Sequence, residues 1–229
     1  MTEAPQQLVF ELAHRPALGL EDFLVSESNA EAVLLIDRWP DWPVGAAIIV
    51  GPRGCGKSHL ANVWRLRSGA RSSRAADVTR ATVPELSASP ALVIEDIEAT
   101  ADQAALFHML NLVREQRLAL LLTANAAAGE LPLTLPDLVS RLKALPFAAI
   151  QPADDALLRA VLVKLFADRQ LSVEPHIIDY VLIRMERSMA AAQALVHEID
   201  RQALVLQRRV TRAVAALALE RLGFDSQTP

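Results

Sequence analysis

Residues 51–58 read Gly51-Pro52-Arg53-Gly54-Cys55-Gly56-Lys57-Ser58 and match the pattern G-x-x-x-x-G-K-[S/T] at every fixed position. An apolar run, 46–50, precedes them, and a stretch of helical character, 59–66, follows. In such a strand–loop–helix context the glycines let successive backbone N–H groups point at phosphate oxygens, and the helix N-terminus adds partial positive charge. The alternative is a glycine-rich turn that only happens to precede Lys57 and Ser58. We predict a phosphate-binding loop.

The loop chemistry assigns roles to its residues. Lys57 is expected to reach the β- and γ-phosphates, and the Ser58 hydroxyl to bind Mg²⁺. The predicted cofactor is therefore a nucleoside di- or triphosphate with Mg²⁺, held by residues 51–58 together with His59. Cys55 is the only cysteine of the chain, so no intrachain disulfide is possible. Cys55 is best explained as a small loop residue, and a redox role is the alternative.

The composition is that of a globular chain with a sizeable core. The 229 residues are 52% hydrophobic and 22% charged, and their net charge of −4 argues against a protein whose whole surface grips nucleic acid. The N-terminus has no basic segment typical of a signal peptide. No apolar stretch reaches the roughly 18 residues of a membrane span. We therefore expect a soluble, cytoplasmic protein without a membrane partner.

Apolar strand candidates alternate with helical segments from residue 46 onward. Strands are expected at 46–50, 91–95, 118–123 and 147–150, with a weaker one near 70–76, and helices at 57–67, 79–87, 102–115 and 135–143. This alternation predicts an α/β fold with a five-stranded parallel sheet covered on both faces. Residues 154–222 read as helix, with breaks near 172–175, Ser188 and 210–211. The predicted organisation is an N-terminal tail (1–16), an α/β nucleotide-binding domain (17–151) and a small all-α subdomain (152–229).

Two strand ends carry polar side chains that suit phosphate chemistry. The strand 91–95 runs into Glu95 and Asp96, and the strand 118–123 runs into Asn125. An acid beside a phosphate-binding loop can hold the metal or act as a base, and an amide can orient a water. A solvated acidic turn is the alternative for the two acids, and a turn-forming asparagine is the alternative for Asn125.

The order of these parts resembles the AAA+ ATPases, and within them the DnaA clade. The likeness runs from about residue 7 to 222, and it rests on Glu21-Asp22-Phe23-Leu24-Val25 with Ser28-Asn29, Gly56-Lys57-Ser58-His59-Leu60, and Leu135-Pro136-Asp137-Leu138-Val139-Ser140-Arg141-Leu142. It implies an AAA+ α/β domain followed by a helical lid.

The resemblance also implies roles for single residues. Phe23 and Val25 would lie beside the adenine of bound ADP or ATP. Glu95 would hold the metal, Asp96 would be the catalytic carboxylate at the base position, and Asn125 would sense the phosphate. Arg141 would be an arginine finger, acting in trans on the γ-phosphate held by a neighbouring subunit. Read alone, Arg141 is a solvated arginine near the end of a helix.

The N-terminal stretch Gln7-Leu8-Val9-Phe10-Glu11-Leu12 resembles the peptide that binds the DNA polymerase sliding clamp. Gln7 would form a hydrogen bond at a pocket rim, and Leu8, Phe10 and Leu12 would bury apolar area. The alternative is an ordinary first strand, since these three apolar residues alternate with others.

Departures from the family pattern argue against efficient intrinsic hydrolysis. The two acids stand in the order Glu95-Asp96, and Ala190 holds the place of an arginine expected on the lid, with Arg187 three residues earlier. No DNA-reading domain is expected after the lid. The basic residues of the late helices, Arg201, Arg208, Arg209 and Arg212, fit a solvated helix face, with phosphate contact as the alternative.

The resemblance therefore implies a negative regulator of replication initiation. Its expected partners are the DnaA initiator and the sliding clamp, and a homo-oligomer is a further option. Such a chain would stimulate hydrolysis of the ATP that DnaA holds. The alternatives are a DnaA-family ATPase that acts by its own turnover and an adaptor that acts by recruitment.

Overall fold

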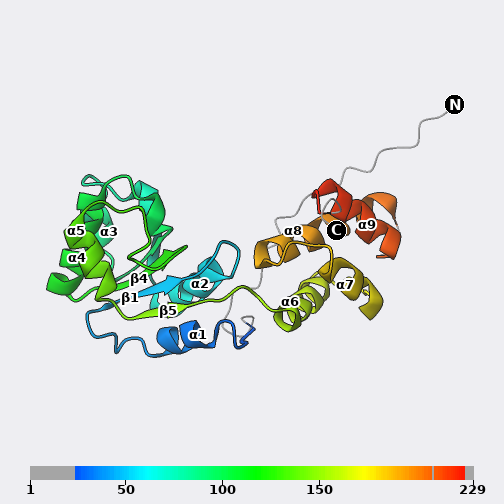
Figure 1. Ribbon diagram of the computed structural model, residues 1–229, viewed down its shortest axis with the longest axis horizontal. Helices are drawn as coiled ribbons and strands as arrows, with labels where there is room; N and C mark the ends of the chain where they lie inside the picture. The colour runs from blue at the N-terminus through cyan, green and yellow to red at the C-terminus, as the bar shows by residue number, and fades with distance from the viewer. Residues whose placement is uncertain (1–23, 208, 225–229) are drawn as a thin grey trace. The chain divides into compact units, whose positions relative to one another are not determined.

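The computed structural model describes residues 24–207 and 209–224. They form two compact units, and the chain passes from the first to the second between Asp154 and Asp155. The first unit is α/β and the second is all-α (Figure 1). No helix in the described part of the chain is long and apolar enough to cross a membrane.

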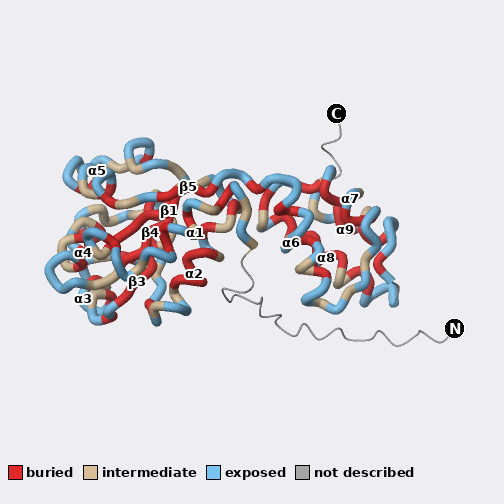
Figure 2. The backbone as a smooth tube through the Cα atoms, turned by 90° about the horizontal axis from the view of Figure 1, so that it is seen from below, coloured by how far each residue is buried: buried red, intermediate tan, exposed pale blue. Residues whose placement is uncertain are grey.

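The first unit is built on a five-stranded parallel sheet in the order β2-β3-β4-β1-β5. The strands are β1 (Ala46–Val50), β2 (Arg71–Arg74), β3 (Ala91–Glu95), β4 (Ala119–Ala124) and β5 (Phe147–Ala149). Every residue of β1 is buried, as are most residues of β3 and β4, because these three strands are covered on both faces (Figure 2). The predicted α/β fold with five parallel strands is confirmed.

Helices cover both faces of this sheet. Ile48 and Val50 of β1 pack in a core with α3 (Val83–Ser87), α4 (Gln103–Gln116) and α5 (Pro136–Lys143). Ala47 and Ile49, which point to the other face, pack with α1 (Ala30–Asp37) and α2 (Lys57–Ser68). Two short 3₁₀ turns, η2 (Ala75–Asp77) and η3 (Ile97–Ala99), follow β2 and β3. Alternate strand residues thus fill two cores, as a period of two requires.

The edge strand β2 explains why its sequence signal was weak. Its residues Arg71, Ser72, Ser73 and Arg74 are polar, and none of them is buried. An edge strand does not need apolar residues on both faces, and charged side chains discourage pairing with other chains. β2 is therefore held in place by its pairing with β3 and not by burial of its own side chains.

The three tryptophans gather on the face covered by α1 and α2. Trp64 is fully buried, stacks on Trp42 at 5.2 Å between ring centroids and meets Trp39 edge-on at 5.9 Å. The indole N–H of Trp42 donates a buried hydrogen bond to the Leu35 carbonyl at 2.8 Å, which serves the last turn of α1. The indole N–H of Trp64 has no acceptor among the described residues.

This contrast predicts unequal costs for two similar substitutions. Trp42→Phe should destabilise the unit by about 1–3 kcal/mol more than Trp64→Phe, because it leaves the Leu35 carbonyl unpaired. Both variants lose the same ring volume, so each serves as the packing control for the other. Urea unfolding followed by circular dichroism measures the difference. Equal costs would contradict the role given to the Trp42 hydrogen bond.

The second unit consists of α6 (Asp155–Asp168), α7 (Pro175–Leu182), α8 (Met189–Leu206) and α9 (Arg212–Arg221). Pro175 opens α7, where its missing N–H costs nothing. Ser188 and Thr211 cap the next two helices, since their hydroxyls accept from the N–H groups of Ala191 and Val214. The breaks expected near 172–175, 188 and 210–211 are confirmed.

A buried carboxylate links the last two helices of this unit. Glu198 of α8 accepts hydrogen bonds from Arg201 at 2.8 and 2.9 Å and from Gln202 at 2.7 Å, and Arg221 of α9 lies 3.5 Å away. The hydrogen bond from Arg201 is the main cause that lowers the pKa of Glu198, and burial opposes it. The ionised form is therefore the one that this arrangement stabilises.

A lowered pKa makes the stability of the helical unit depend on acid pH. The contribution of Glu198 is fully present above the ordinary glutamate pKa, about 4.3, and is lost as the pH falls through the lower folded value. Glu198→Gln should lower stability at pH 7 and flatten its decline below about pH 4.3. Urea midpoints of both proteins across this range test it, and parallel curves would contradict it.

Candidate functional site

The glycine loop leaves β1 through positions that only glycine fits. A Cβ on Gly51 would lie 2.4 Å from the Ile150 carbonyl oxygen and 2.9 Å from the Cys55 sulfur. Both distances are too short, so any larger residue would force the backbone to move. Gly56 stands at φ 107° immediately before α2, a left-handed conformation that side chains disfavour. The loop therefore keeps the shape that a phosphate-binding loop requires.

Lys57 lies over this loop. Its side chain is buried, and its ammonium donates hydrogen bonds to the carbonyl oxygens of Gly51 at 2.7 Å and Pro52 at 2.9 Å. α2 begins at Lys57, so the first N–H groups of that helix have no acceptor within it. A held ammonium and a free helix N-terminus both favour an anion at the loop.

The other predicted loop residues differ in exposure. Pro52, Arg53 and Ser58 are exposed, and His59 is half-buried. No cluster of three or more His, Cys, Asp or Glu side chains within residues 24–207 and 209–224 is arranged to hold a metal. Mg²⁺ commonly uses one or two protein ligands and takes the rest from phosphates and water. The exposed Ser58 hydroxyl is suited to supply one such ligand.

Cys55 belongs to the loop and is buried. Burial raises the pKa of its thiol, and the Lys57 ammonium opposes this shift. A buried thiol with a raised pKa is a poor nucleophile, which weighs against the redox alternative.

The sheet topology brings the loop and both polar strand ends to one edge. β4 lies between β3 and β1, all three run parallel, and their carboxyl ends lead into Glu95, Asn125 and Gly51. The N–H of Gly51 donates to the Ala124 carbonyl at 3.1 Å, which ties the loop to the end of β4. Glu95 is half-buried and Asn125 is exposed at this edge.

Asp96 has a different environment from Glu95. It adopts a left-handed backbone, with φ 57°, and its N–H donates to the hydroxyl of fully buried Thr123 at 3.1 Å. Its carboxylate lies 3.9 Å from the Arg74 guanidinium at the end of β2. β2 is the outer neighbour of β3, whereas the loop follows β1 on the opposite side. This contact does not orient Asp96 toward the loop.

Glu98 is a third carboxylate at this edge, and the sequence reasoning missed it. It belongs to η3, and its Oε2 accepts from the Asn125 backbone N–H at 3.3 Å. Its spacing of three residues from Glu95 was the available signal. Glu98 thus connects the end of β4 to the turn after β3.

Val25 lies in a segment that is tied to the same edge. Asn29 donates to the Leu24 carbonyl and accepts from the Ser26 N–H, which fixes the turn before α1. The N–H of Gln151, just beyond β5, donates to the Ser28 carbonyl at 2.8 Å. Val25 itself is 60% exposed. Phe23 and the predicted clamp-binding residues Gln7, Leu8, Phe10 and Leu12 lie outside the described residues.

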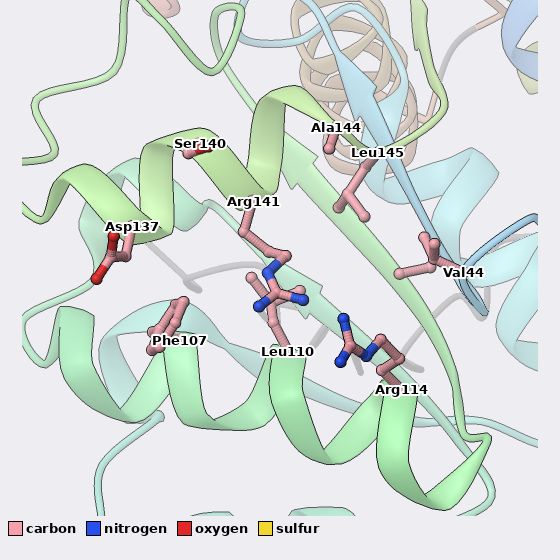
Figure 3. Close-up of a pocket in the computed structure, with 10 residues that line it drawn as sticks. Val44, Phe107, Leu110, Arg114, Asp137, Ser140, Arg141, Ala144 and Leu145 are labelled. Atoms are coloured by element: carbon pink, nitrogen blue, oxygen red, sulfur yellow. The ribbon is translucent and has the colours of Figure 1, made fainter.

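Arg141 lies at the opposite edge of the sheet. It occupies the last turn of α5, and its guanidinium lies 5.7 Å from the centre of the Phe107 ring of α4. It lines a pocket of about 500 Å³ whose wall includes Val44 and Ala46, at the start of β1 (Figure 3). The loop follows the other end of β1, so Arg141 and the loop lie at opposite ends of that strand.

Ala190 holds the place of the arginine expected on the lid, and Arg187 is the nearest arginine before it; both lie in the helical unit. Ala190 is exposed in the first turn of α8. Arg187 lies before this helix, and its guanidinium lies 3.1 Å from the Asp155 carboxylate, with both side chains more than half exposed. Such an exposed pair contributes little stability.

The comparisons with known proteins identify the fold. No family model matches the chain, and a search of curated proteins gives no match. Among solved structures, domain III of the Thermotoga maritima replication initiation protein DnaA has a TM-score of 0.77 at 17% identity, over 90% of this chain and 97% of that chain. The AMPPCP-bound DnaA from Aquifex aeolicus gives 0.70 at 20% identity, over 85% and 68%.

The chain has the AAA+ fold. The same fold appears in the RuvB Holliday junction branch migration motor of Thermotoga maritima, with a TM-score of 0.69 at 15% identity over 89% of this chain and 72% of that one. At these identities the likeness establishes the fold alone. That fold is the one seen in domain III of DnaA. In this AAA+ domain the glycine loop, Glu95 and Asn125 share one sheet edge.

Proposed function

We propose that this chain is a regulator of replication initiation resembling Hda, the regulatory inactivator of DnaA. It would bind adenine nucleotide at its own loop and stimulate hydrolysis of ATP held by DnaA. The observation that carries this proposal is the position of Arg141. The residue lies beside the start of β1, whereas the loop follows the end of that strand. An arginine there cannot serve its own nucleotide, but it is available to a neighbouring one.

Nucleotide binding is supported by the loop geometry. Gly51 and Gly56 hold conformations that suit a phosphate cradle, and Lys57 is in reach of the loop carbonyls. A similar fold in DnaA binds AMPPCP. We propose ADP or ATP as the ligand, with Val25 near the base. Ser58 and Glu95 would hold Mg²⁺, which when bound neutralises charge on the phosphates.

Weak turnover of its own nucleotide is part of the proposal. The Asp96 carboxylate lies near Arg74 on the outer strand, on the far side of β3 from the loop. A general base must come within hydrogen-bond reach of the water that it activates. Asp96 therefore lacks the geometry of an efficient base, although Asn125 lies at the correct edge to orient a water. The bound nucleotide would act as a structural ligand.

Clamp binding rests on the sequence alone. Gln7, Leu8, Phe10 and Leu12 would attach the chain to the sliding clamp and so raise its effective concentration near DnaA on DNA. Deletion of residues 1–12 tests this attachment when stimulation is measured with and without clamp. The deletion should lower stimulation only when clamp is loaded on DNA, and an equal loss without clamp would contradict the attachment.

A purified reconstitution tests the proposed function. DnaA loaded with ATP is mixed with clamp-loaded DNA and this chain, and phosphate release is followed. We expect release to depend on the chain, while the chain without DnaA releases little. Absence of stimulation would overturn the proposal. Rapid release by the chain without DnaA would instead favour an ATPase that works by its own turnover, and recruitment of DnaA without hydrolysis would favour an adaptor.

A further inference from the structure

A second arginine shares the pocket of Arg141. Arg114 occupies the last turn of α4, as Arg141 occupies the last turn of α5. Both side chains line the pocket, and Figure 3 shows their guanidinium groups facing each other. The remaining wall is largely apolar and includes Val44, Leu110 and Leu145. Two cations from different helices thus converge on one opening.

These two guanidinium groups have no carboxylate between them. Within the described residues neither forms an ion pair, and Arg141 contacts the Phe107 ring. Asp137, the only acid lining the pocket among the described residues, lies on the far side of Phe107 from Arg114 (Figure 3). The pair is therefore not neutralised inside the pocket.

The position of Arg114 and Arg141 at helix C-termini explains why an arginine is favourable there. It does not explain why the two guanidinium groups face each other. The C-terminus of a helix carries partial negative charge, which favours an arginine in the last turn of α4 and of α5. That effect would operate equally with the side chains turned away from the pocket. Lys143 in the same turn of α5 is an example, since it is exposed and does not line the pocket. Two facing cations repel each other, and an anion between them removes the repulsion.

We propose that Arg114 is a second phosphate-binding residue that acts in trans beside Arg141. This inference rests on the proposed function, because the phosphates belong to ATP held by DnaA. One guanidinium can bind two oxygens with its planar fork, and a triphosphate offers more oxygens than one fork can serve. The γ-phosphoryl group also spreads its charge over three oxygens as it is transferred. Arg114 is exposed at the rim and Arg141 is half-buried, so both can meet an incoming anion.

The experiment compares Arg114→Ala with Lys143→Ala in the reconstitution with DnaA, clamp and DNA. Loss of one charge-assisted contact should lower the maximal rate of stimulated hydrolysis roughly 10- to 100-fold in Arg114→Ala. Lys143→Ala should behave like the unaltered chain. Arg114→Lys keeps the charge but loses the fork, so it should recover only part of the rate. Thermal unfolding of each variant verifies the fold.

Binding to DnaA loaded with ADP separates a phosphate contact from a protein contact. Arg114→Ala should bind ADP-loaded DnaA as the unaltered chain does, because no γ-phosphate is present. Weakened binding in that state would make Arg114 a protein contact and overturn the inference. Full stimulation by Arg114→Ala, with Arg141→Ala inactive, would overturn it too and leave the proposed function standing. If the unaltered chain gives no stimulation, the proposed function itself fails.

Discussion

Arg141→Ala should abolish the stimulation of DnaA-bound ATP hydrolysis, lowering it roughly 10³- to 10⁵-fold. An arginine supplied from a neighbouring subunit stabilises charge that develops on the γ-phosphate, so its loss acts on the rate of the chemical step. The fold should survive, because Arg141 is half-buried and its guanidinium lies over the Phe107 ring, without an ion pair among the described residues. Phosphate release from ATP-loaded DnaA on clamp-loaded DNA gives the measurement.

Arg141→Lys is the matched control for charge. Lysine keeps the positive charge but lacks the planar fork that binds two phosphate oxygens, so we expect recovery of a small fraction of the activity. Both variants should still bind ADP-loaded DnaA. Stimulation by Arg141→Ala at the rate of the unaltered chain would remove the arginine from the mechanism, and with it the basis of the proposed function.

The architecture could be predicted from the sequence because strands and helix starts leave local patterns in it. A buried parallel strand needs a continuous apolar run, and β1, β3 and β4 have one. Helix starts need capping side chains or proline, and Pro175, Ser188 and Thr211 supply them where breaks were expected. The edge strand β2 gave a weak signal, since an exposed strand needs neither apolar faces nor a regular pattern.

The environment of the acids could not be predicted, because it depends on residues far apart in the chain. The Asp96 carboxylate lies near Arg74 of another strand, and the Glu98 carboxylate accepts from the backbone of Asn125. Motif spacing treats Glu95 and Asp96 as a pair, while the left-handed backbone at Asp96 separates their surroundings. The pocket was equally hidden, because Arg114 and Arg141 meet only through the packing of α4 on α5. The clamp-binding peptide stays a prediction.

Lys57→Ala should weaken nucleotide binding by about 2–5 kcal/mol, or roughly 30- to 4000-fold in Kd. The ammonium is held over the loop by the carbonyl oxygens of Gly51 and Pro52, so little conformational freedom is lost when a phosphate takes a further hydrogen bond. Titration of a fluorescent ADP analogue gives the measurement.

Lys57→Met separates the charge from the packing of the side chain. Lys57 is 7% exposed, and methionine fills a similar volume, so the fold should be retained while the affinity falls as in Lys57→Ala. Unchanged affinity in both variants would contradict a phosphate-binding loop.

The same variants then show what the chain's own nucleotide does. If the bound nucleotide is a structural ligand, Lys57→Met should lose stimulation of DnaA in proportion to nucleotide occupancy, and a large excess of ADP should restore it, whereas Arg141→Ala cannot be rescued in this way.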